Sequence, residues 1–253
     1  MSESNPGRIH RLLFSSIGAK FVMGATGVIL VGFVLVHMLG NLQIYIGPDT
    51  FNHYAQTLKG TAPLLWGVRV TLLVAVTLHI WAAVRLTRMN WTARPQAYAA
   101  RRRYDRTSYA ALFMRGSGVV VLAFIIYHLL HFTIGVVQPA SFDLHEVLRG
   151  DVWVRETNAQ VIAALPTHHV RHDAYSMFVY GFQNWLVSAS YIVAVLLLGR
   201  HLSHGVASML ATLGYSKGRR RLTAERIGAA IAAVVTLGNL SFPIAVLAGV
   251  VHL

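Results

Sequence analysis

The fold class of this chain is decided by an apolar stretch near its N-terminus, where residues 21–44 read FVMGATGVILVGFVLVHMLGNLQI. No Asp, Glu, Lys or Arg occurs in it. Because about 20 apolar residues in a helix cross the hydrocarbon core of a bilayer, this stretch predicts a membrane-spanning helix. Four further stretches are apolar over a similar length, near residues 65–88, 115–137, 177–202 and 227–251. We therefore expect an all-α integral membrane protein in which residues 1–253 form a single membrane domain with five spans.

The composition of the whole chain agrees with this class. Of its 253 residues, 55% are hydrophobic and only 12% are charged, which is half of the roughly 25% typical of a soluble domain. Too few polar groups are present to cover the surface of a soluble enzyme of this size. The chain has no Cys, which excludes disulfides, thiolate zinc sites and iron–sulfur clusters held by Cys.

The distribution of basic residues predicts the orientation in the membrane. The formal net charge is +13, and 17 of the 22 Lys and Arg residues lie in segments 1–20, 85–115 and 200–226. The opposite side holds four, Lys59, Arg149, Arg155 and Arg171. By the positive-inside rule the N-terminus is cytoplasmic and the C-terminus lies outside. Topology explains the Arg clusters, so they do not indicate nucleic-acid binding, although the same face can meet anionic lipid headgroups or an acidic partner. The longest connection, 138–176, is expected to be a polar outer cap or loop.

Histidines are concentrated in the predicted spans. Ionisable groups are costly in hydrocarbon and usually have a partner or a function. No Asp or Glu lies in a span interior, so these imidazoles have no carboxylate to pair with, which favours metal ligation over a proton relay. Neutral imidazole is a common axial ligand of haem iron. The six histidines in or near spans are His37, His79, His128, His131, His201 and His204.

Depth in the membrane sorts four of these histidines into two pairs. At 1.5 Å per residue, His37 and His128 lie roughly 20–24 Å from the inner ends of their spans. His79 and His201 lie near Arg85 and Arg200, at the inner ends of theirs. Four helices thus supply two histidines at each of two depths, about 10–15 Å apart. This arrangement predicts a four-helix bundle that clamps two stacked haems.

Spacing alone leaves some choices open. His131 and His204 each follow another histidine by three residues and share its helix face. Either member of a pair is a candidate ligand, and the other is then close to a haem or quinone. A single histidine in a span is also commonly a helix–helix contact. Glycines in spans one and three have two readings, close helix packing or room for a porphyrin face; they are Gly24, Gly27, Gly32, Gly116 and Gly118.

Several sequence strings carry a family resemblance over nearly the whole chain. They are SIGAKFVMGATG at 16–27, HMLGNL at 37–42, FNHY at 51–54, NWTARP at 90–95, MRGSG at 114–118, HLLHF at 128–132 and HLSHG at 201–205, together with Arg69 and His79. With these strings the chain closely resembles the membrane-anchoring cytochrome b subunit of succinate dehydrogenases and fumarate reductases, of the single-chain, five-span, dihaem type.

The resemblance implies four axial ligands for two haems b. The strings align His37 with His128 for an outer haem and His79 with His201 for an inner haem, and they select His128 over His131 and His201 over His204. The fifth span then has no ligand. The resemblance also implies a flavoprotein subunit and an iron–sulfur subunit docked on the cytoplasmic face of an inner membrane, on residues 1–20, 89–113 and 214–226.

The resemblance further implies electron transfer to or from a quinone, here expected to be menaquinone, in a pocket close to the outer haem. The candidate quinone-binding residues are Asn41, Gln43, His53, Tyr54 and Arg69; interface anchoring and helix capping are the alternative roles for each. Some dihaem fumarate reductases carry a transmembrane Glu beside the ligand of the fourth helix. Gly199 and its leucine neighbours offer no acid here, which puts a proton pathway along that helix in doubt.

Two other classes compete with this function. A bis-His cytochrome b anchor of a hydrogenase or formate dehydrogenase has the same chemistry, but the quoted strings favour the succinate dehydrogenase type. A transporter or haem-free anchor would use the histidines to line a substrate path. Transporters usually show broken helices or internal repeats, and the sequence shows neither. Haem content separates these classes.

Overall fold

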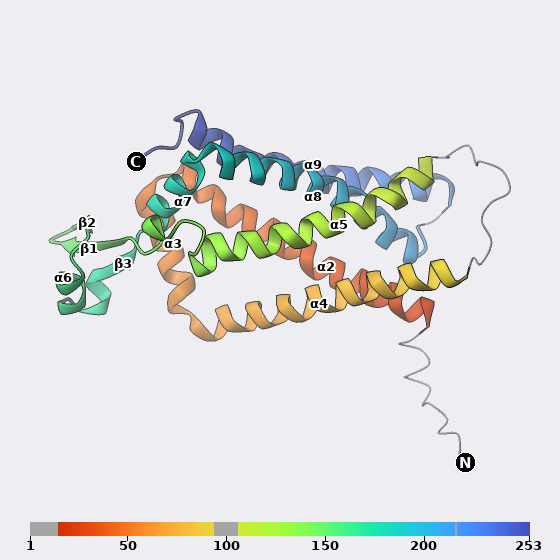
Figure 1. Cartoon of the computed structure of the whole chain (residues 1–253), viewed down its shortest axis with the longest axis horizontal. Helices are drawn as coiled ribbons and strands as arrows, with labels where there is room; N and C mark the ends of the chain where they lie inside the picture. Colours follow the sequence, from red (N-terminus) through yellow and green to blue (C-terminus); the bar gives the residue numbers. More distant parts are fainter. Residues whose placement is uncertain (1–14, 94–105, 216) are drawn as a thin grey trace, which may run out of the picture. The chain divides into compact units, whose positions relative to one another are not determined.

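The computed structural model describes residues 15–93, 106–215 and 217–253. Parts of segments 1–20, 89–113 and 214–226, the predicted docking surface, therefore lie outside the described residues. The described chain is predominantly helical (Figure 1), and five helices are long and apolar enough to cross a membrane. They are α2 (Ser16–Asn41), α4 (Ala62–Thr92), α5 (Arg106–Leu129), α8 (Trp185–Thr212) and α9 (Gly218–Leu247). The length and composition of these helices are compatible with the expected all-α membrane protein.

Helix ends extend and correct the expected spans. Helix α2 continues into the 3-10 turn η1 (Leu42–Tyr45), and α5 continues into a π turn, η2 (Leu130–Ile134), which ends at Gly135 with φ +83°. The expected span 177–202 is wrong at its start, because residues 177–183 belong to a separate helix, α7 (Ala174–Gln183). Asn184 has an extended backbone, and its Oδ1 accepts hydrogen bonds from the backbone N–H groups of Leu186 (3.0 Å) and Val187 (3.4 Å). The side chain therefore caps a new helix.

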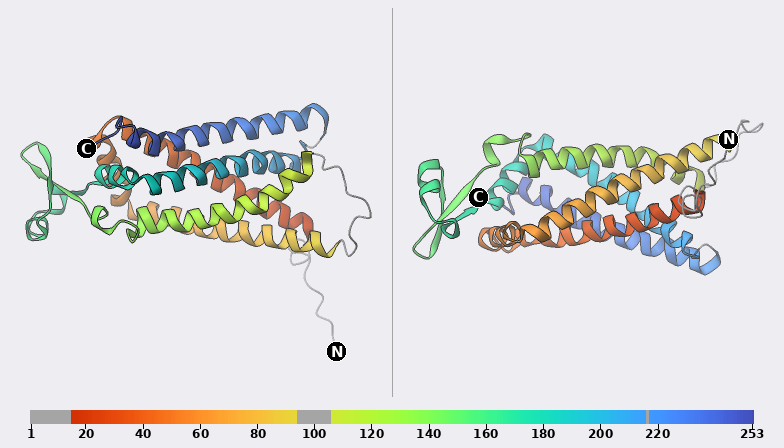
Figure 2. Two further views of the ribbon diagram at one scale, coloured as in Figure 1. Left: turned by 45° about the horizontal axis from the view of Figure 1, so that its top comes forward. Right: turned by 90° about the horizontal axis from the view of Figure 1, so that it is seen from below.

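The connection 138–176, for which the sequence predicts a polar cap or loop, contains regular secondary structure. It forms an antiparallel sheet of β1 (His145–Arg149), β2 (Val152–Glu156) and β3 (Val170–His172) in the order β2-β1-β3. Gly150 opens the β1–β2 turn with φ +65°, a conformation that glycine adopts without steric cost. The short elements η3 (Pro139–Ser141), α6 (Ala159–Ala164) and η4 (Thr167–His169) complete the connection. Both views in Figure 2 show the strands and α6 gathered together.

The chain divides into two compact units, and each of the five long helices contributes to both. Unit 1 comprises Met1–Val34, Gly67–Met114 and Leu202–Ile231, and unit 2 comprises Leu35–Trp66, Arg115–His201 and Ala232–Leu253. Small residues let helices approach closely within each unit. In unit 1, a Cβ on Gly228 of α9 would collide with the backbone O of Ser203 in α8. In unit 2, a Cβ on Gly238 would collide with the side chain of Met38, and one on Gly199 with the Thr236 hydroxyl.

The core of unit 2 is aromatic. Helix α3 (Pro48–Gly60) packs on α7, where Phe51 lies edge-on to Phe178 with ring centroids 5.6 Å apart. Phe182 and Tyr191 continue this core into α8. Many large apolar side chains on the long helices stay exposed, such as Leu73 at 66% and Val119 at 69%. Exposed apolar side chains suit lipid contact, because hydrocarbon does not penalise them as water does.

Candidate functional site

Unit 2 brings together the two histidines that the sequence places at the outer depth. The ring centroids of His37 in α2 and His128 in α5 lie 5.8 Å apart, with the ring planes at 88°. Aromatic side chains surround His128, with Phe124, Phe132 and Tyr191 centroids at 5.8–6.0 Å. His128 also has a polar neighbour, the Tyr191 hydroxyl, which lies 3.4 Å from its Nδ1.

His131 has a different environment from His128. It is 3% exposed and lies in the π turn η2. Its Nδ1 lies 2.9 Å from the Tyr191 hydroxyl, and its Nε2 lies 3.2 Å from Oε1 of Gln138. Both ring nitrogens are engaged, so neither is available to a metal ion in this arrangement. The structure thus separates two histidines that their spacing left equivalent.

In unit 1, His79 of α4 faces α2. Its Nδ1 lies 3.0 Å from the hydroxyl of Thr26. That hydroxyl donates its single proton to the backbone O of Val22 at 2.7 Å, so its oxygen is the acceptor for an Nδ1–H group of His79. In a neutral imidazole the proton is then on Nδ1, and Nε2 keeps its lone pair.

His201 of α8 lies in unit 2, against the start of the predicted third span. Its Nδ1 lies 3.3 Å from the hydroxyl of Ser117 in α5. His201 and His79 belong to different units. His204 is half-buried and belongs to unit 1.

Two of the singled-out glycines lie beside histidines. A Cβ added to Gly27 would stand 3.8 Å from His79 Cε1, and one on Gly118 would stand 3.5 Å from His201 Cε1. A Cβ on Gly24 would contact Met209, which favours helix packing at that position, while Gly32 and Gly116 have no neighbouring atom within 4 Å of an added Cβ. The glycines therefore serve more than one purpose.

The candidate quinone-binding residues divide between the units. Asn41, Gln43, His53 and Tyr54 lie in unit 2, whereas Arg69 lies in unit 1 and is exposed. The Asn41 amide donates a hydrogen bond to the backbone O of His37 at 3.0 Å, and the Tyr54 hydroxyl occupies the space that a side chain at Gly40 would need. His53 is exposed, and Gln43 is half-buried.

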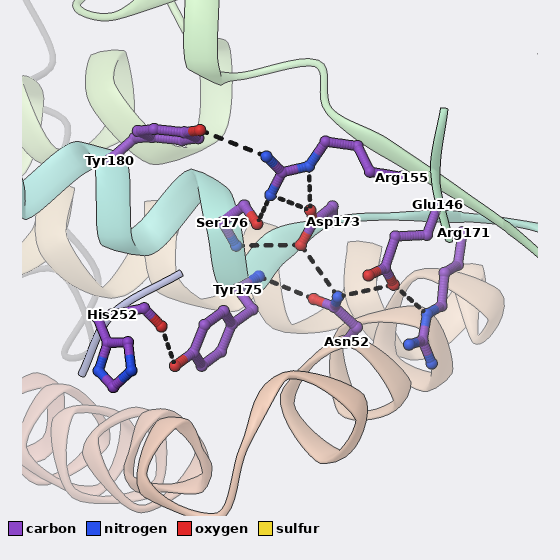
Figure 3. Close-up of polar contacts among 9 residues, drawn as sticks. All are labelled: Asn52, Glu146, Arg155, Arg171, Asp173, Tyr175, Ser176, Tyr180 and His252. Atoms are coloured by element: carbon purple, nitrogen blue, oxygen red, sulfur yellow. Dashed lines mark hydrogen bonds and ion pairs between the residues drawn. The ribbon is translucent and has the colours of Figure 1, made fainter. Parts of the chain in front are cut away.

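A buried polar network in unit 2 was missed by sequence reasoning (Figure 3). At its centre Asn52 is 0% exposed, and its amide donates to Glu146 and Asp173, both at 3.1 Å. Its oxygen accepts from the backbone N–H of Tyr175 at 2.8 Å. Asn52 thereby joins α3 to β1 and to the first turn of α7. The available signal was a cluster of charged residues in a chain that is otherwise poor in them.

Two arginines complete this network. Arg171 is 4% exposed and donates to Glu146 and Asp49, both at 2.8 Å. Arg155 donates two hydrogen bonds to Asp173, at 3.1 and 3.3 Å, and another to Ser176. Desolvation alone raises the pKa of Asp173, but the hydrogen bonds from Ser176 and Asn52 and the charge of Arg155 outweigh it and lower the pKa. The network is satisfied internally and ties the sheet to α3 and α7.

Within the described ranges, no group of three or more His, Cys, Asp or Glu side chains is arranged to hold a bare metal ion. No family model, curated protein or solved structure matches this chain. Its function is therefore inferred from the geometry of its own side chains and from the sequence strings.

Proposed function

We propose that this chain is the membrane-anchor cytochrome b subunit of a succinate:quinone oxidoreductase. In this proposal His37 and His128 are the axial ligands of an outer haem b, and His79 and His201 are those of an inner haem b. The observation that carries the proposal concerns three of these four histidines. His79, His128 and His201 each place Nδ1 within 3.0–3.4 Å of a hydroxyl on another helix.

This contact suits a haem ligand for a chemical reason. A histidine that binds a metal through one ring nitrogen usually donates the hydrogen on the other to an acceptor, which sets the tautomer and the orientation of the ring. Thr26 imposes this state on His79, because its own proton is committed to Val22. His131, with both nitrogens engaged, does not fit the role.

The residues around the ligands also fit a haem. Gly27 and Gly118 leave no side chain between their helices and the imidazoles of His79 and His201. Phe124, Phe132 and Tyr191 pack around His128 and give this proposed ligand an aromatic environment. Bound haem supplies one-electron transfer, while the protein sets ligation, burial and distance.

The remaining parts of the proposal come from the family resemblance. A flavoprotein subunit and an iron–sulfur subunit dock on the cytoplasmic face of the inner membrane, and a quinone, proposed to be menaquinone, binds beside the outer haem. Asn41 is the best placed of the quinone candidates, because it follows His37 by one helical turn and contacts its backbone.

Haem stoichiometry tests the proposal. The full chain is purified in detergent, and haem b is measured as pyridine haemochrome per chain. We expect two haems in the parent and at most one in each of His37→Ala, His79→Ala, His128→Ala and His201→Ala. His131→Ala and His204→Ala are the matched controls and keep two. A folded parent without haem overturns the proposal in favour of a haem-free anchor or transporter. Loss in a control with retention in its neighbour reassigns the ligand.

A further inference from the structure

We infer that Tyr191 is a positioning residue for His128. A chain of hydrogen bonds from Gln138 through His131 and Tyr191 holds His128 in the tautomer that keeps Nε2 free for iron. The inference rests on the proposed function, because it assigns residues that act on a proposed ligand.

The donor and acceptor roles in this series of hydrogen bonds follow from Gln138. Its amide nitrogen donates to the backbone O of Gly181, which only accepts, and its Oε1 faces His131 Nε2 at 3.2 Å. An amide oxygen cannot donate a hydrogen bond. The proton of this contact is therefore on His131 Nε2.

The next step follows from the chemistry of a neutral imidazole. With its proton on Nε2, His131 presents a lone pair at Nδ1. The Tyr191 hydroxyl lies 2.9 Å from that nitrogen and donates its proton there. Tyr191 has one proton, so its oxygen accepts in its other contact, with His128 Nδ1 at 3.4 Å. His128 therefore carries its proton on Nδ1, and Nε2 keeps a lone pair.

Burial leaves these hydrogen-bonded side chains little freedom to rearrange. Tyr191 is 5% exposed and His131 is 3% exposed. The Tyr191 ring is held edge-on by Phe124 at 5.0 Å and Phe182 at 4.9 Å. Gly181 is needed in the same place, because a Cβ there would stand 3.0 Å from Phe132 and 3.3 Å from His131.

The arrangement has a measurable electronic consequence. An acceptor on the Nδ1–H of a ligating histidine makes the imidazole a stronger donor. A stronger donor stabilises oxidised iron and lowers the reduction potential of its haem. Removing the Tyr191 hydroxyl is therefore expected to raise the potential of the outer haem alone.

The test uses Tyr191→Phe in the full complex in native membranes, with each haem followed by potentiometric titration and electron paramagnetic resonance. Tyr127→Phe is the matched control. The ring centroid of Tyr127 lies 5.9 Å from that of Tyr191, but Tyr127 is not one of the residues assigned to the series of hydrogen bonds. We expect Tyr191→Phe to keep two haems, to raise the potential of one and to shift the g values of that haem. Tyr127→Phe leaves both haems at parent values.

A second variant, Gln138→Leu, changes a half-buried residue and removes the acceptor that fixes the His131 tautomer. We expect it to raise the reduction potential of the same haem by a smaller amount. The inference fails if Tyr191→Phe has the same haem potentials and g values as Tyr127→Phe. Where Tyr191→Phe does not fold, the inference fails if Gln138→Leu has the haem potentials of the parent. In both cases a parent with two haems still supports the proposed function. A parent without haem overturns both.

Discussion

Single hydroxyl groups set the state of histidines in the long apolar helices. Thr26 accepts from His79 because its proton is already given to Val22, and Tyr191 accepts from His128 because its proton goes to His131. In each case a side-chain hydroxyl on one helix orients an imidazole ring on another. Such contacts are strong constraints in an apolar interior, where an unsatisfied polar group is costly.

Thr26→Val tests this control at His79, a proposed ligand of the inner haem. The variant keeps the shape of the side chain but removes the acceptor for His79 Nδ1–H, and losing such a partner typically costs about 10- to 100-fold in metal affinity. We expect haem to leave Thr26→Val faster than the parent when apomyoglobin is present as an acceptor, with rescue by Thr26→Ser. Thr77→Val is the control, since Thr77 makes a similar bond to its own helix and is exposed. Equal rates in Thr26→Val and Thr77→Val would contradict the assignment.

At the scale of elements, the close helix contacts and the three-stranded sheet are sensitive to different changes. Helices α8 and α9 approach closely at Gly228, whereas β3 is held by hydrogen bonds and ion pairs of its own residues, Arg171 and His172. The first contact depends on the absence of a side chain, and the second depends on protonation. Each therefore responds to a different perturbation.

Gly228→Leu is expected to destabilise the protein. Its Cβ would collide with the backbone O of Ser203, and overpacking typically costs about 1–3 kcal/mol. We expect a lower midpoint of thermal unfolding in detergent. Gly205→Leu is the comparison, because an added Cβ there has no neighbouring atom within 4 Å. If the two variants unfold at the same temperature, α8 and α9 do not meet closely at Gly228.

The three-stranded sheet is expected to lose stability as the pH falls below about 6.5. Burial lowers the pKa of His172 from its ordinary 6.5, assisted by the charge of Lys59. The unfolded chain then binds a proton at a pH where the folded sheet does not, so acid favours unfolding until the pH reaches the folded pKa. Hydrogen exchange of residues 145–172 at pH 7.5 and 5.5 measures this. His172→Gln should reduce the pH dependence, while exposed His168→Gln should retain it.

At the scale of the whole molecule, charge distribution predicts which side of the membrane each segment meets. Of the Lys and Arg residues, 17 are in segments assigned to the cytoplasm, and four are in those assigned to the outside. The sheet and the network around Asn52 are built from segments on the predicted outer side. Orientation is therefore a property of the chain as a whole.

Accessibility of single cysteines tests this orientation, and the chain has no native Cys to interfere. Thr167 in η4 and Lys217 before α9 are both exposed. Thr167→Cys lies on the predicted outer side, and Lys217→Cys lies on the predicted cytoplasmic side. In intact spheroplasts, a membrane-impermeant maleimide should label Thr167→Cys fully and Lys217→Cys only after permeabilisation. The reverse pattern would invert the topology.

The sequence alone determined the helical class and the number of long apolar helices, because hydrophobic length is a local property that a window of about 20 residues contains. It also placed His37 and His128 at one depth, and the structure has them side by side. Helix ends were less predictable: the break at Asn184 depends on a capping hydrogen bond rather than on hydropathy.

Only the tertiary structure distinguished His128 from His131 by their contacts, because Gln138, Tyr191 and the tautomers they impose come from separate parts of the chain. It also showed the sheet and the Asn52 network, whose short strands and partners 94–123 residues apart leave no periodic signal. Hydrophobic patterning specifies which segments are helices, whereas the hydrogen bonds of a polar side chain depend on which segments meet.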